Sequence, residues 1–310
     1  MIRNEELEKT ISESGKFQEN AQSAWVTSIY PVDSVQWCGS SPFCSELVLA
    51  ESPTYGRFLA TDGEMQSTQS DEVIYHEHLV HPAIVAYRAM YGDKPLRVLV
   101  LGAGEGATIR ELVRYSRDSV EYIMWNDIDE HLVNLCDEHL AYVSKDSPLW
   151  EQVYNDPKRC ERRYDDANTL LKEDCEPYDI VICDLPDPVF EGDVFGLYSD
   201  QFWKDMHGCT AEKCVVSTHT GPIGASKIDM ATTLWLQGVV QAQGFSKPLA
   251  GRASIPSFLA EWGYIVFTKN DPITEYPGDW AKHLPEGCEV LEESALQSFY
   301  NIPKYYYSRK

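Results

Sequence analysis

Residues 98–106, Val98-Leu99-Val100-Leu101-Gly102-Ala103-Gly104-Glu105-Gly106, decide the fold class of this chain. A short apolar run that leads directly into a glycine-rich turn is typical of a buried parallel strand whose carboxyl end faces a ligand. The glycines have the spacing Gly-x-Gly-x-Gly and lack the Gly-x-Gly-x-x-Gly offset that brings the backbone against a dinucleotide pyrophosphate. The loop therefore predicts a nucleoside site and makes NAD the less favoured ligand.

Further apolar runs follow this one and alternate with helical stretches. Such alternation predicts βαβ units and a parallel sheet covered by helices on both faces. The predicted fold class is therefore α/β, with a Rossmann-like parallel sheet. The predicted strands are 122–125, 160–164, 179–183, 214–217 and 263–267, with a helix at 229–243.

Three segments are expected along the chain. Residues 1–40 are polar and predict an irregular N-terminal extension. Residues 41–85 predict a small β-strand domain, with strands at 46–51 and 57–61 and a connecting helix that begins after Ser70 or Asp71. Residues 86–310 predict the Rossmann-like catalytic domain.

Composition limits the partners of the protein. The chain has 310 residues with 26 Lys plus Arg and 49 Asp plus Glu, a net charge of −23 that repels nucleic acid and anionic membranes and permits cationic ligands. Acidity can also serve solubility alone. The first residues do not resemble a signal peptide, and no run of about 18 apolar residues occurs. The nine cysteines contain no Cys-x-x-Cys pair, which predicts reduced thiols in a cytoplasmic protein.

Acidic residues follow the three predicted strands that come after the glycine loop. Asp127, the pair Asp165 and Asp166, and then Asp184 with Asp187 come directly after consecutive apolar runs. Because the carboxyl ends of parallel strands meet along one edge of a sheet, we expect these carboxylates to converge with the glycine loop. Asp127 is placed to accept hydrogen bonds from two ribose hydroxyls.

Glu105 indicates the charge of the ligand. A carboxylate inside the glycine loop opposes a phosphate and favours a cation, although it can also serve as an acid at a helix N-terminus. S-adenosylmethionine offers an ammonium and a sulfonium together with a carboxylate. The decarboxylated form keeps both cations and drops the anion that Glu105 and Asp184 would repel.

Alkyl transfer to an amine needs a base, because an ammonium group has no lone pair. Asp184, with Tyr75 hydrogen-bonded nearby, is the candidate base, and Asp187 would hold a second nitrogen of a polycation. Residues 189–198 predict a mobile lid. The run 75–81 is rich in histidine but lacks the His-Glu-x-x-His spacing, so no metal site is predicted and His78 and His81 are expected to pack or face solvent.

Several blocks in one order resemble the polyamine aminopropyltransferases, the family of spermidine and spermine synthases. The resemblance extends from about Ser41 to Lys269 and is carried by Asp62-Gly63-Glu64-Met65-Gln66, Asp71-Glu72-Val73-Ile74-Tyr75-His76-Glu77, the glycine loop through Arg110-Glu111, Asp127-Ile128-Asp129, and Tyr178-Asp179 through Asp187-Pro188. It implies a Rossmann-like domain of the class I S-adenosylmethionine-dependent methyltransferase type after a small N-terminal β domain.

The resemblance also implies ligands and site residues. The co-substrate would be decarboxylated S-adenosylmethionine without a metal, the product methylthioadenosine, and the partner a small-molecule polyamine bound by a homo-oligomer (dimer or tetramer). Gly102 and Gly104 would form the co-substrate loop; Gln66 and Glu105 would line its aminopropyl side, Asp127 its ribose, and Asp165 and Asp166 its adenine. Tyr75, His76 and Asp187 would meet the acceptor around the base Asp184.

Finer motifs are similar to those of thermospermine synthases. They are Gly104-Glu105-Gly106, Gly221-Pro222-Ile223-Gly224, and Ile255-Pro256-Ser257-Phe258, which places Phe258 at the acceptor. Spermidine is therefore the favoured acceptor. Ser45 and His219 depart from the family pattern, and a protonated His219 would repel a polyamine. An amine N-methyltransferase that uses intact S-adenosylmethionine and a non-catalytic nucleoside- or polyamine-binding homologue remain as alternatives.

Overall fold

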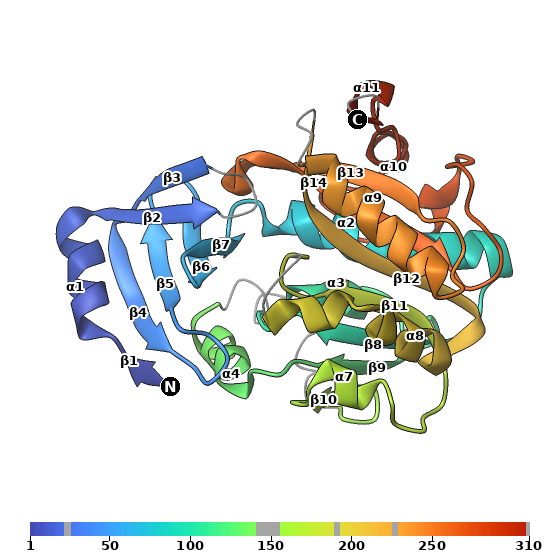
Figure 1. Cartoon of the computed structure of the whole chain (residues 1–310), viewed down its shortest axis with the longest axis horizontal. Helices are drawn as coiled ribbons and strands as arrows, with labels where there is room; N and C mark the ends of the chain where they lie inside the picture. Colours follow the sequence, from blue (N-terminus) through green and yellow to red (C-terminus); the bar gives the residue numbers. More distant parts are fainter. Residues whose placement is uncertain (22–25, 141–155, 189–192, 225–228, 308–310) are drawn as a thin grey trace.

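Two sheets lie side by side in the computed structural model, a small antiparallel sheet near the N-terminus and a larger one that carries the glycine loop (Figure 1). The structure describes residues 1–21, 26–140, 156–188, 193–224 and 229–307. The larger sheet has the strand order β10-β9-β8-β11-β12-β14-β13. This arrangement confirms the predicted α/β, Rossmann-like fold behind a small β domain.

The N-terminal unit is built from antiparallel pairs. Its five-stranded sheet contains β1 (Ile2–Arg3), β4 (Ser34–Ser40), β5 (Leu47–Ser52), β6 (Gly56–Thr61) and β7 (Glu64–Thr68). A separate pair, β2 (Lys16–Ala21) and β3 (Val26–Pro31), follows the helix α1 (Glu5–Ser14). The strands predicted at 46–51 and 57–61 are thus present as β5 and β6.

The prediction of an irregular segment at 1–40 was wrong, because this segment forms α1 and the strands β1 to β4. The pattern misled because β2 and β3 bury polar side chains beside the apolar Phe17 and Tyr30 and also expose an apolar one. Glu19 and Ser28 are buried, whereas Ile29 on the same strand pair is 60% exposed. The alternation of apolar and polar residues in the sequence therefore does not show which side of this segment is buried.

The larger sheet has five parallel strands at one side. They are β8 (Leu96–Gly102), β9 (Val120–Asn126), β10 (Cys160–Arg163), β11 (Tyr178–Asp184) and β12 (Thr210–Ile223). The strand β14 (Ala260–Thr268) runs antiparallel to both neighbours, β12 and β13 (Leu249–Ile255). Each predicted strand is present. The edge strand β13 was not predicted, and the sheet is mostly rather than wholly parallel.

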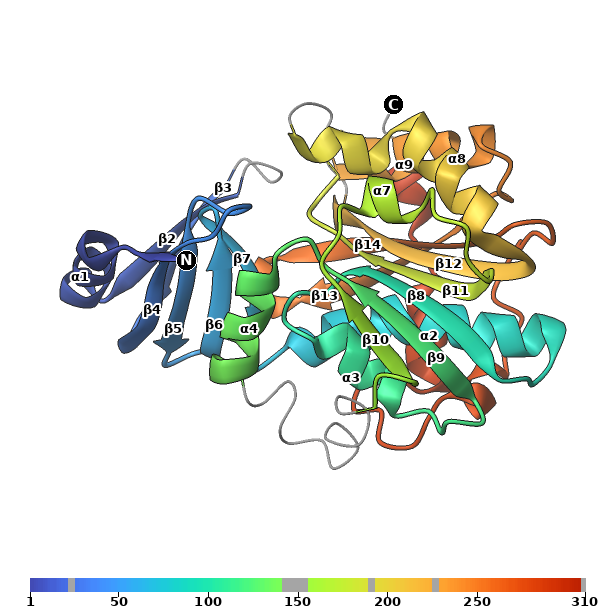
Figure 2. The same cartoon turned by 90° about the horizontal axis from the view of Figure 1, so that it is seen from below.

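Helices cover both faces of this sheet (Figure 2). One face packs against α2 (Glu72–Tyr91) and α3 (Ala107–Val113), and the other against α7 (Ala167–Leu170), α8 (Asp200–Cys209) and α9 (Asp229–Ala242). The predicted helix at 229–243 is α9. Leu135 of α4 (Glu130–His139) instead packs against Leu47 and Leu59 of the N-terminal sheet.

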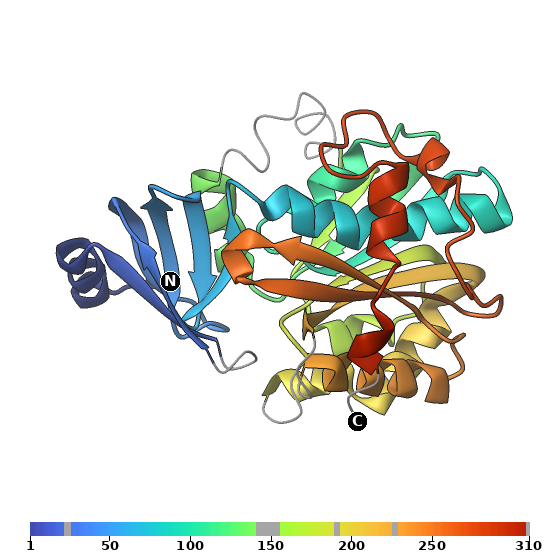
Figure 3. The ribbon, with the colours of Figure 1, turned by 90° about the horizontal axis from the view of Figure 1, so that it is seen from above.

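The C-terminal residues complete the α2 side of the molecule (Figure 3). Phe299 of α10 (Glu293–Phe299) is buried over β13, where Gly251 leaves room for its ring. The other short helices are η1 (Asp193–Tyr198), η2 (Pro256–Phe258), η3 (Trp280–His283) and α11 (Lys304–Tyr307). Among the helices of the described ranges, none is both long and apolar enough to cross a membrane.

The strand order reverses at β8, which lies between β9 and β11. At the carboxyl end of β8, Gly102 adopts φ +85°, and a Cβ atom there would lie 1.9 Å from the carbonyl oxygen of Asp184 on β11. Only glycine fits this backbone conformation and this close approach. Gly102 thereby brings the glycine loop against the end of β11.

We expect Gly102→Ala to destabilise the protein by several kcal/mol, because it adds a backbone clash to the cost of a positive φ, about 1 to 2 kcal/mol. Gly63→Ala is the matched control: Gly63 has φ +80° but nothing within 4 Å of its Cβ position. Urea unfolding of both variants measures the difference. An equal loss of stability in the two variants would mean that the approach of Gly102 to Asp184 is not tight.

Candidate active site

The glycine loop connects β8 to α3 and lies beside the end of β9. Gly106 caps α3 with φ +87°. A Cβ atom on Gly104 would lie 3.2 Å from Asp127 Oδ2 and 2.9 Å from Leu132 Cδ2. The structure therefore brings Gly102, Gly104 and Asp127 together at the carboxyl edge of the sheet, where the sequence predicted the crevice.

Asp127 is a buried carboxylate at the end of β9, with 9% of its surface exposed. Burial raises the pKa of Asp127 to about 6; the backbone N–H of Asp129, which donates to Asp127 Oδ1 at 2.8 Å, lowers it, and the charges of Asp129 and Asp184 raise it again. A buried carboxylate whose negative charge is poorly solvated is strongly stabilised by new hydrogen-bond donors. This environment suits a carboxylate that receives ribose hydroxyls.

Asp184 is the last residue of β11, and its carboxylate accepts hydrogen bonds from two hydroxyl groups. Tyr75 donates to Asp184 Oδ1 at 2.9 Å, and Thr108 of α3 donates to Asp184 Oδ2 at 2.6 Å. Burial, and then the charge of Asp184, raises the pKa of Tyr75 well above its ordinary value, so Tyr75 stays a donor. Each carboxylate oxygen keeps a further lone pair, so Asp184 can still accept a proton or a hydrogen bond.

His76 and Glu105 form an ion pair beside Asp184. His76 Nε2 lies 2.8 Å from Glu105 Oε1 and 3.9 Å from Asp184 Oδ2. Burial lowers the pKa of His76, but Glu105 and Glu72 outweigh this effect and raise the pKa well above its ordinary value. The second oxygen of Glu105, Oε2, is buried and has no hydrogen-bond partner.

Three residues that were predicted to bind the acceptor lie near Tyr75. They are Asp187, His219 and Phe258. Asp187 Oδ1 lies 3.6 Å from His219 Nδ1, and the rings of His219 and Phe258 lie 5.9 and 6.0 Å from the Tyr75 ring. His219 Nε2 donates to the carbonyl of Leu185 at 2.6 Å, so the buried Nδ1, which has no hydrogen-bond partner, offers a lone pair while the ring is neutral.

The N-terminal unit adds negative charge near Asp187. Burial raises the pKa of Asp187 to about 6; His219 lowers it, and Glu64 and Glu19 raise it. Glu19 is itself buried, where it accepts the Tyr30 hydroxyl at 2.8 Å and the Met65 backbone N–H at 2.9 Å. The acidic side of the crevice therefore extends from β11 toward β2 and β7.

Three residues that were predicted to bind the co-substrate make none of the contacts described above. Gln66 is exposed, and its amide donates to the Glu64 carbonyl at 3.3 Å. Asp165 follows β10 and pairs with Arg163 at 2.6 Å, and Asp166 caps α7 through the Asn168 backbone N–H at 2.9 Å. Their assignment to the co-substrate remains a prediction. Of the predicted lid, residues 189–192 lie outside the described residues, and the remainder is η1.

Sequence reasoning missed several residues that shape the site. Thr108 lies in the first turn of α3, only two residues after the glycine loop, and this position was its only local signal. Glu72 lies in a block that carries the family resemblance but was given no role, and Glu19 lies in the segment that was predicted to be irregular. Only the tertiary structure brings them to the crevice.

The other two histidines of the run 75–81, His78 and His81, pack inside the protein. His78 is buried and lies 2.7 Å from the Ile74 carbonyl, and burial lowers its pKa to about 4. His81 contacts Glu111 at 3.2 Å and the Tyr115 hydroxyl at 3.1 Å. No group of three or more histidine, cysteine, aspartate or glutamate side chains among the described residues could hold a metal ion.

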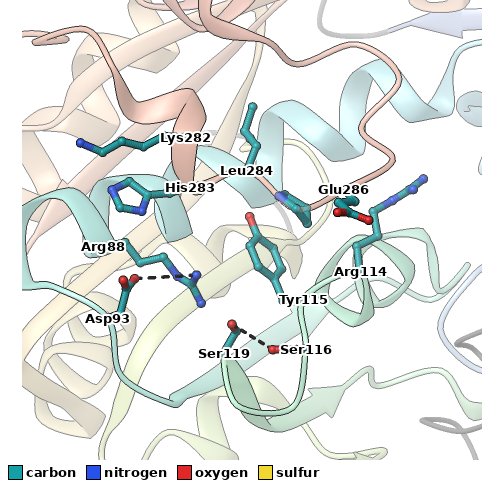
Figure 4. A pocket seen from close by; sticks show the side chains of 11 residues that line it. Arg88, Asp93, Arg114, Tyr115, Ser116, Ser119, Lys282, His283, Leu284 and Glu286 are labelled. Atoms are coloured by element: carbon teal, nitrogen blue, oxygen red, sulfur yellow. Dashed lines mark hydrogen bonds and ion pairs between the residues drawn. The ribbon is translucent and has the colours of Figure 1, made fainter.

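A separate cleft of about 320 Å³ lies at the other end of α2 (Figure 4). Arg88, Tyr115 and His283 line it together with Arg114 and Lys282. None of the predicted site residues lines this cleft, and its positive side chains contrast with the acidic crevice. It is therefore distinct from the candidate active site.

Fold and site together define a Rossmann-like protein in which the carboxylates of Asp127 and Asp184 lie beside a glycine loop at the carboxyl ends of parallel strands. Residues 72–276 match the family model of the spermine/spermidine synthase domain. The chain is 36% identical to polyamine aminopropyltransferase 2 of Pseudomonas aeruginosa over 71% of this chain and 58% of that protein. It is 29% identical to a thermospermine synthase of Arabidopsis thaliana over 78% of this chain and 66% of that protein.

The chain belongs to the spermine/spermidine synthase family. The crystal structure of spermidine synthase from Thermotoga maritima has the same fold, with a TM-score of 0.78 over 94% of this chain and 92% of that chain at 20% sequence identity. The match to the Pseudomonas relative spans 58% of that protein's length, and a match to a Synechococcus polyamine aminopropyltransferase spans 59%. The chain therefore spans less than two thirds of the length of these two relatives.

The raised pKa of Asp127 predicts a pH-dependent effect on stability. Between its ordinary value of 3.8 and about 6, the folded protein holds a proton that the unfolded chain has lost, so Asp127 contributes a loss of stability as pH rises through this range. We expect the stability of Asp127→Asn relative to the wild type to improve by about 2 kcal/mol from pH 4 to pH 7.

Urea unfolding of Asp127→Asn and the wild type at both pH values measures this difference. Asp33→Asn, which changes an exposed carboxylate outside the crevice, is the matched control. A relative stability of Asp127→Asn that stays constant with pH would contradict the assigned environment of Asp127.

Proposed function

We propose that this protein is a polyamine aminopropyltransferase, which moves the aminopropyl group of decarboxylated S-adenosylmethionine to an amine and releases methylthioadenosine. The observation that carries the proposal is the buried, unpartnered oxygen of Glu105, which lies in the glycine loop beside Asp184. A buried carboxylate oxygen without a donor is costly, and a ligand ammonium group would satisfy it.

The charges of the crevice support the decarboxylated co-substrate. Glu105, Asp184 and Asp187 come from one edge of the sheet, and the basic side chains that contact them in the described structure are those of His76 and His219. A co-substrate carboxylate placed among them would be repelled, whereas an ammonium and a sulfonium would be attracted. The alternative of an amine N-methyltransferase would require this carboxylate to bind here.

Asp184 is proposed as the general base. Tyr75 and Thr108 fix its carboxylate through one hydroxyl each. Asp184 takes the proton from the acceptor ammonium, whose pKa in water is about 10. The freed nitrogen lone pair then forms the bond to the methylene carbon as the carbon–sulfur bond breaks, and the sulfur leaves with that electron pair as a neutral thioether.

Spermidine is the proposed acceptor. A polyamine longer than putrescine needs negative charge at a distance from the base, and Asp187, Glu64 and Glu19 supply charge that extends toward the N-terminal unit. Phe258 and His219 flank Tyr75 on this side. The similarity to the thermospermine synthase of Arabidopsis thaliana agrees with this choice. A homo-oligomeric, cytoplasmic protein remains a prediction from the sequence.

Asp184→Asn is expected to lower kcat about a hundredfold or more while co-substrate binding is retained, because it removes the base but keeps the shape of the side chain. Methylthioadenosine release measures turnover, and calorimetry measures binding. Asp118→Asn, an exposed carboxylate outside the crevice, is the control and should keep the wild-type rate. Full activity of Asp184→Asn would refute the assigned base.

A panel of putrescine, spermidine and spermine tests the acceptor. We expect the highest kcat/KM with spermidine, because the acidic side chains extend beyond Asp187, and mass spectrometry of the products identifies the extended end. A clear preference for putrescine would refute the spermidine assignment but keep the reaction class. No methylthioadenosine with any amine would favour a non-catalytic homologue.

A further inference from the structure

A continuous series of ion pairs lies buried beneath the glycine loop. His76 connects Glu105 to Glu72 on α2, and Glu72 is bound by Arg110 of α3. Arg110 also donates to Glu111 at 2.8 Å. All five side chains are at least nine-tenths buried. Such a network holds a fixed geometry only if each charged member is paired.

The contacts of His76 define its protonation state. Its Nδ1 faces two acceptors, the Glu72 carbonyl at 2.8 Å and Glu72 Oε2 at 3.0 Å. Its Nε2 faces the carboxylate oxygen Glu105 Oε1 at 2.8 Å. A neutral imidazole has one donor nitrogen only, so both contacts are satisfied together when the ring is an imidazolium. The raised pKa of His76 agrees with this state.

Arg110 holds Glu72 in the position that His76 requires. Its Nη1 donates to Glu72 Oε1 at 2.6 Å and its Nη2 to Oε2 at 2.9 Å, a two-pronged pair that fixes the plane of the carboxylate. Glu72 Oε2 thereby accepts from both Arg110 and His76. An exposed ion pair on the surface would not fix the orientation of the Glu72 carboxylate in this way.

We propose that Glu72 and Arg110 are positioning residues for co-substrate binding: they keep His76 as an imidazolium that ties Glu105 Oε1 and leaves Oε2 free for the ammonium group of the ligand. This proposal rests on the proposed function for the identity of the ligand. If His76 lost its proton from Nε2, two lone pairs would face each other across 2.8 Å and Glu105 would leave this position.

The other groups around His76 make its proton depend on Glu72 and Glu105. Asp184 Oδ2 lies 3.9 Å from Nε2, and the Tyr75 ring lies 4.9 Å from the His76 ring. Tyr75 is an uncharged donor to Asp184. No described cation contacts His76 directly, because Arg110 reaches it only through Glu72. Removal of the Glu72 charge therefore leaves Glu105 as the one carboxylate in hydrogen-bond contact with the ring.

Glu72→Gln tests the proposal, because the amide keeps the size of the side chain and removes its charge. We expect the His76 ring to lose its proton at a lower pH in the variant than in the wild type, because one of its two carboxylate partners is gone. Histidine ring NMR of the unliganded protein reports this directly. The KM for decarboxylated S-adenosylmethionine should then rise about tenfold in Glu72→Gln between pH 6 and pH 9, with little change in the wild type.

Glu77→Gln is the matched control on the same helix. Glu77 is also fully buried, but it accepts the backbone N–H groups of Glu289, Val290 and Leu291 and does not contact His76. We expect it to lower stability and to leave the pH profile of KM unchanged. Glu105→Gln removes the other carboxylate partner of His76 and should also lower the pH at which the ring deprotonates, which provides a second NMR test if Glu72→Gln does not fold.

A His76 ring that titrates alike in the wild type, Glu72→Gln and Glu105→Gln would overturn the positioning role, as would identical KM profiles in the wild type and Glu72→Gln. Because the NMR titration needs no turnover, it separates the two hypotheses. A wild-type protein that forms no methylthioadenosine would refute the proposed function, and the titration would still decide whether the network controls the state of His76.

Discussion

Gly102 and Asp184 meet at the carboxyl ends of the neighbouring parallel strands β8 and β11, and their close approach fixes the geometry of the site. Gly102, the last residue of β8, can have no side chain, because a Cβ atom would lie 1.9 Å from the Asp184 carbonyl oxygen. The glycine loop that follows is therefore held beside the Asp184 carboxylate. One main-chain constraint thus places the glycine loop beside the carboxylate that is proposed as the base.

The second feature that shapes the site is the balance of charge among its side chains. Glu105 forms an ion pair with His76 inside the protein. Burial and neighbouring carboxylates raise the pKa values of Asp127 and Asp187 to about 6. Carboxylates of this kind are costly without a ligand and are relieved by donors or cations. The overall charge of −23 is consistent with a cationic ligand, but the crevice residues carry the argument.

The sequence predicted the parts of the fold that follow from strong periodicity. The apolar runs of β8, β9 and β11 and the acids that follow them led to the sheet and to the convergence of Asp127 and Asp184. The same reasoning failed where side chains contradict binary patterning, as in β2 and β3, where Glu19 is buried and Ile29 is exposed. It also missed Thr108 and Glu72, because their roles depend on how α2 and α3 pack rather than on local sequence. His76 was expected to meet the acceptor, and the structure gives it Glu105 and Glu72 as partners.

We propose that Glu105 selects a ligand that ends in an ammonium group without a neighbouring carboxylate. Calorimetric titration of the wild type and Glu105→Gln with decarboxylated and with intact S-adenosylmethionine tests it most directly. We predict that the wild type binds the decarboxylated form about tenfold more tightly or better, and that Glu105→Gln loses most of this preference. Equal or tighter binding of the intact, carboxylated form by the wild type would contradict the account.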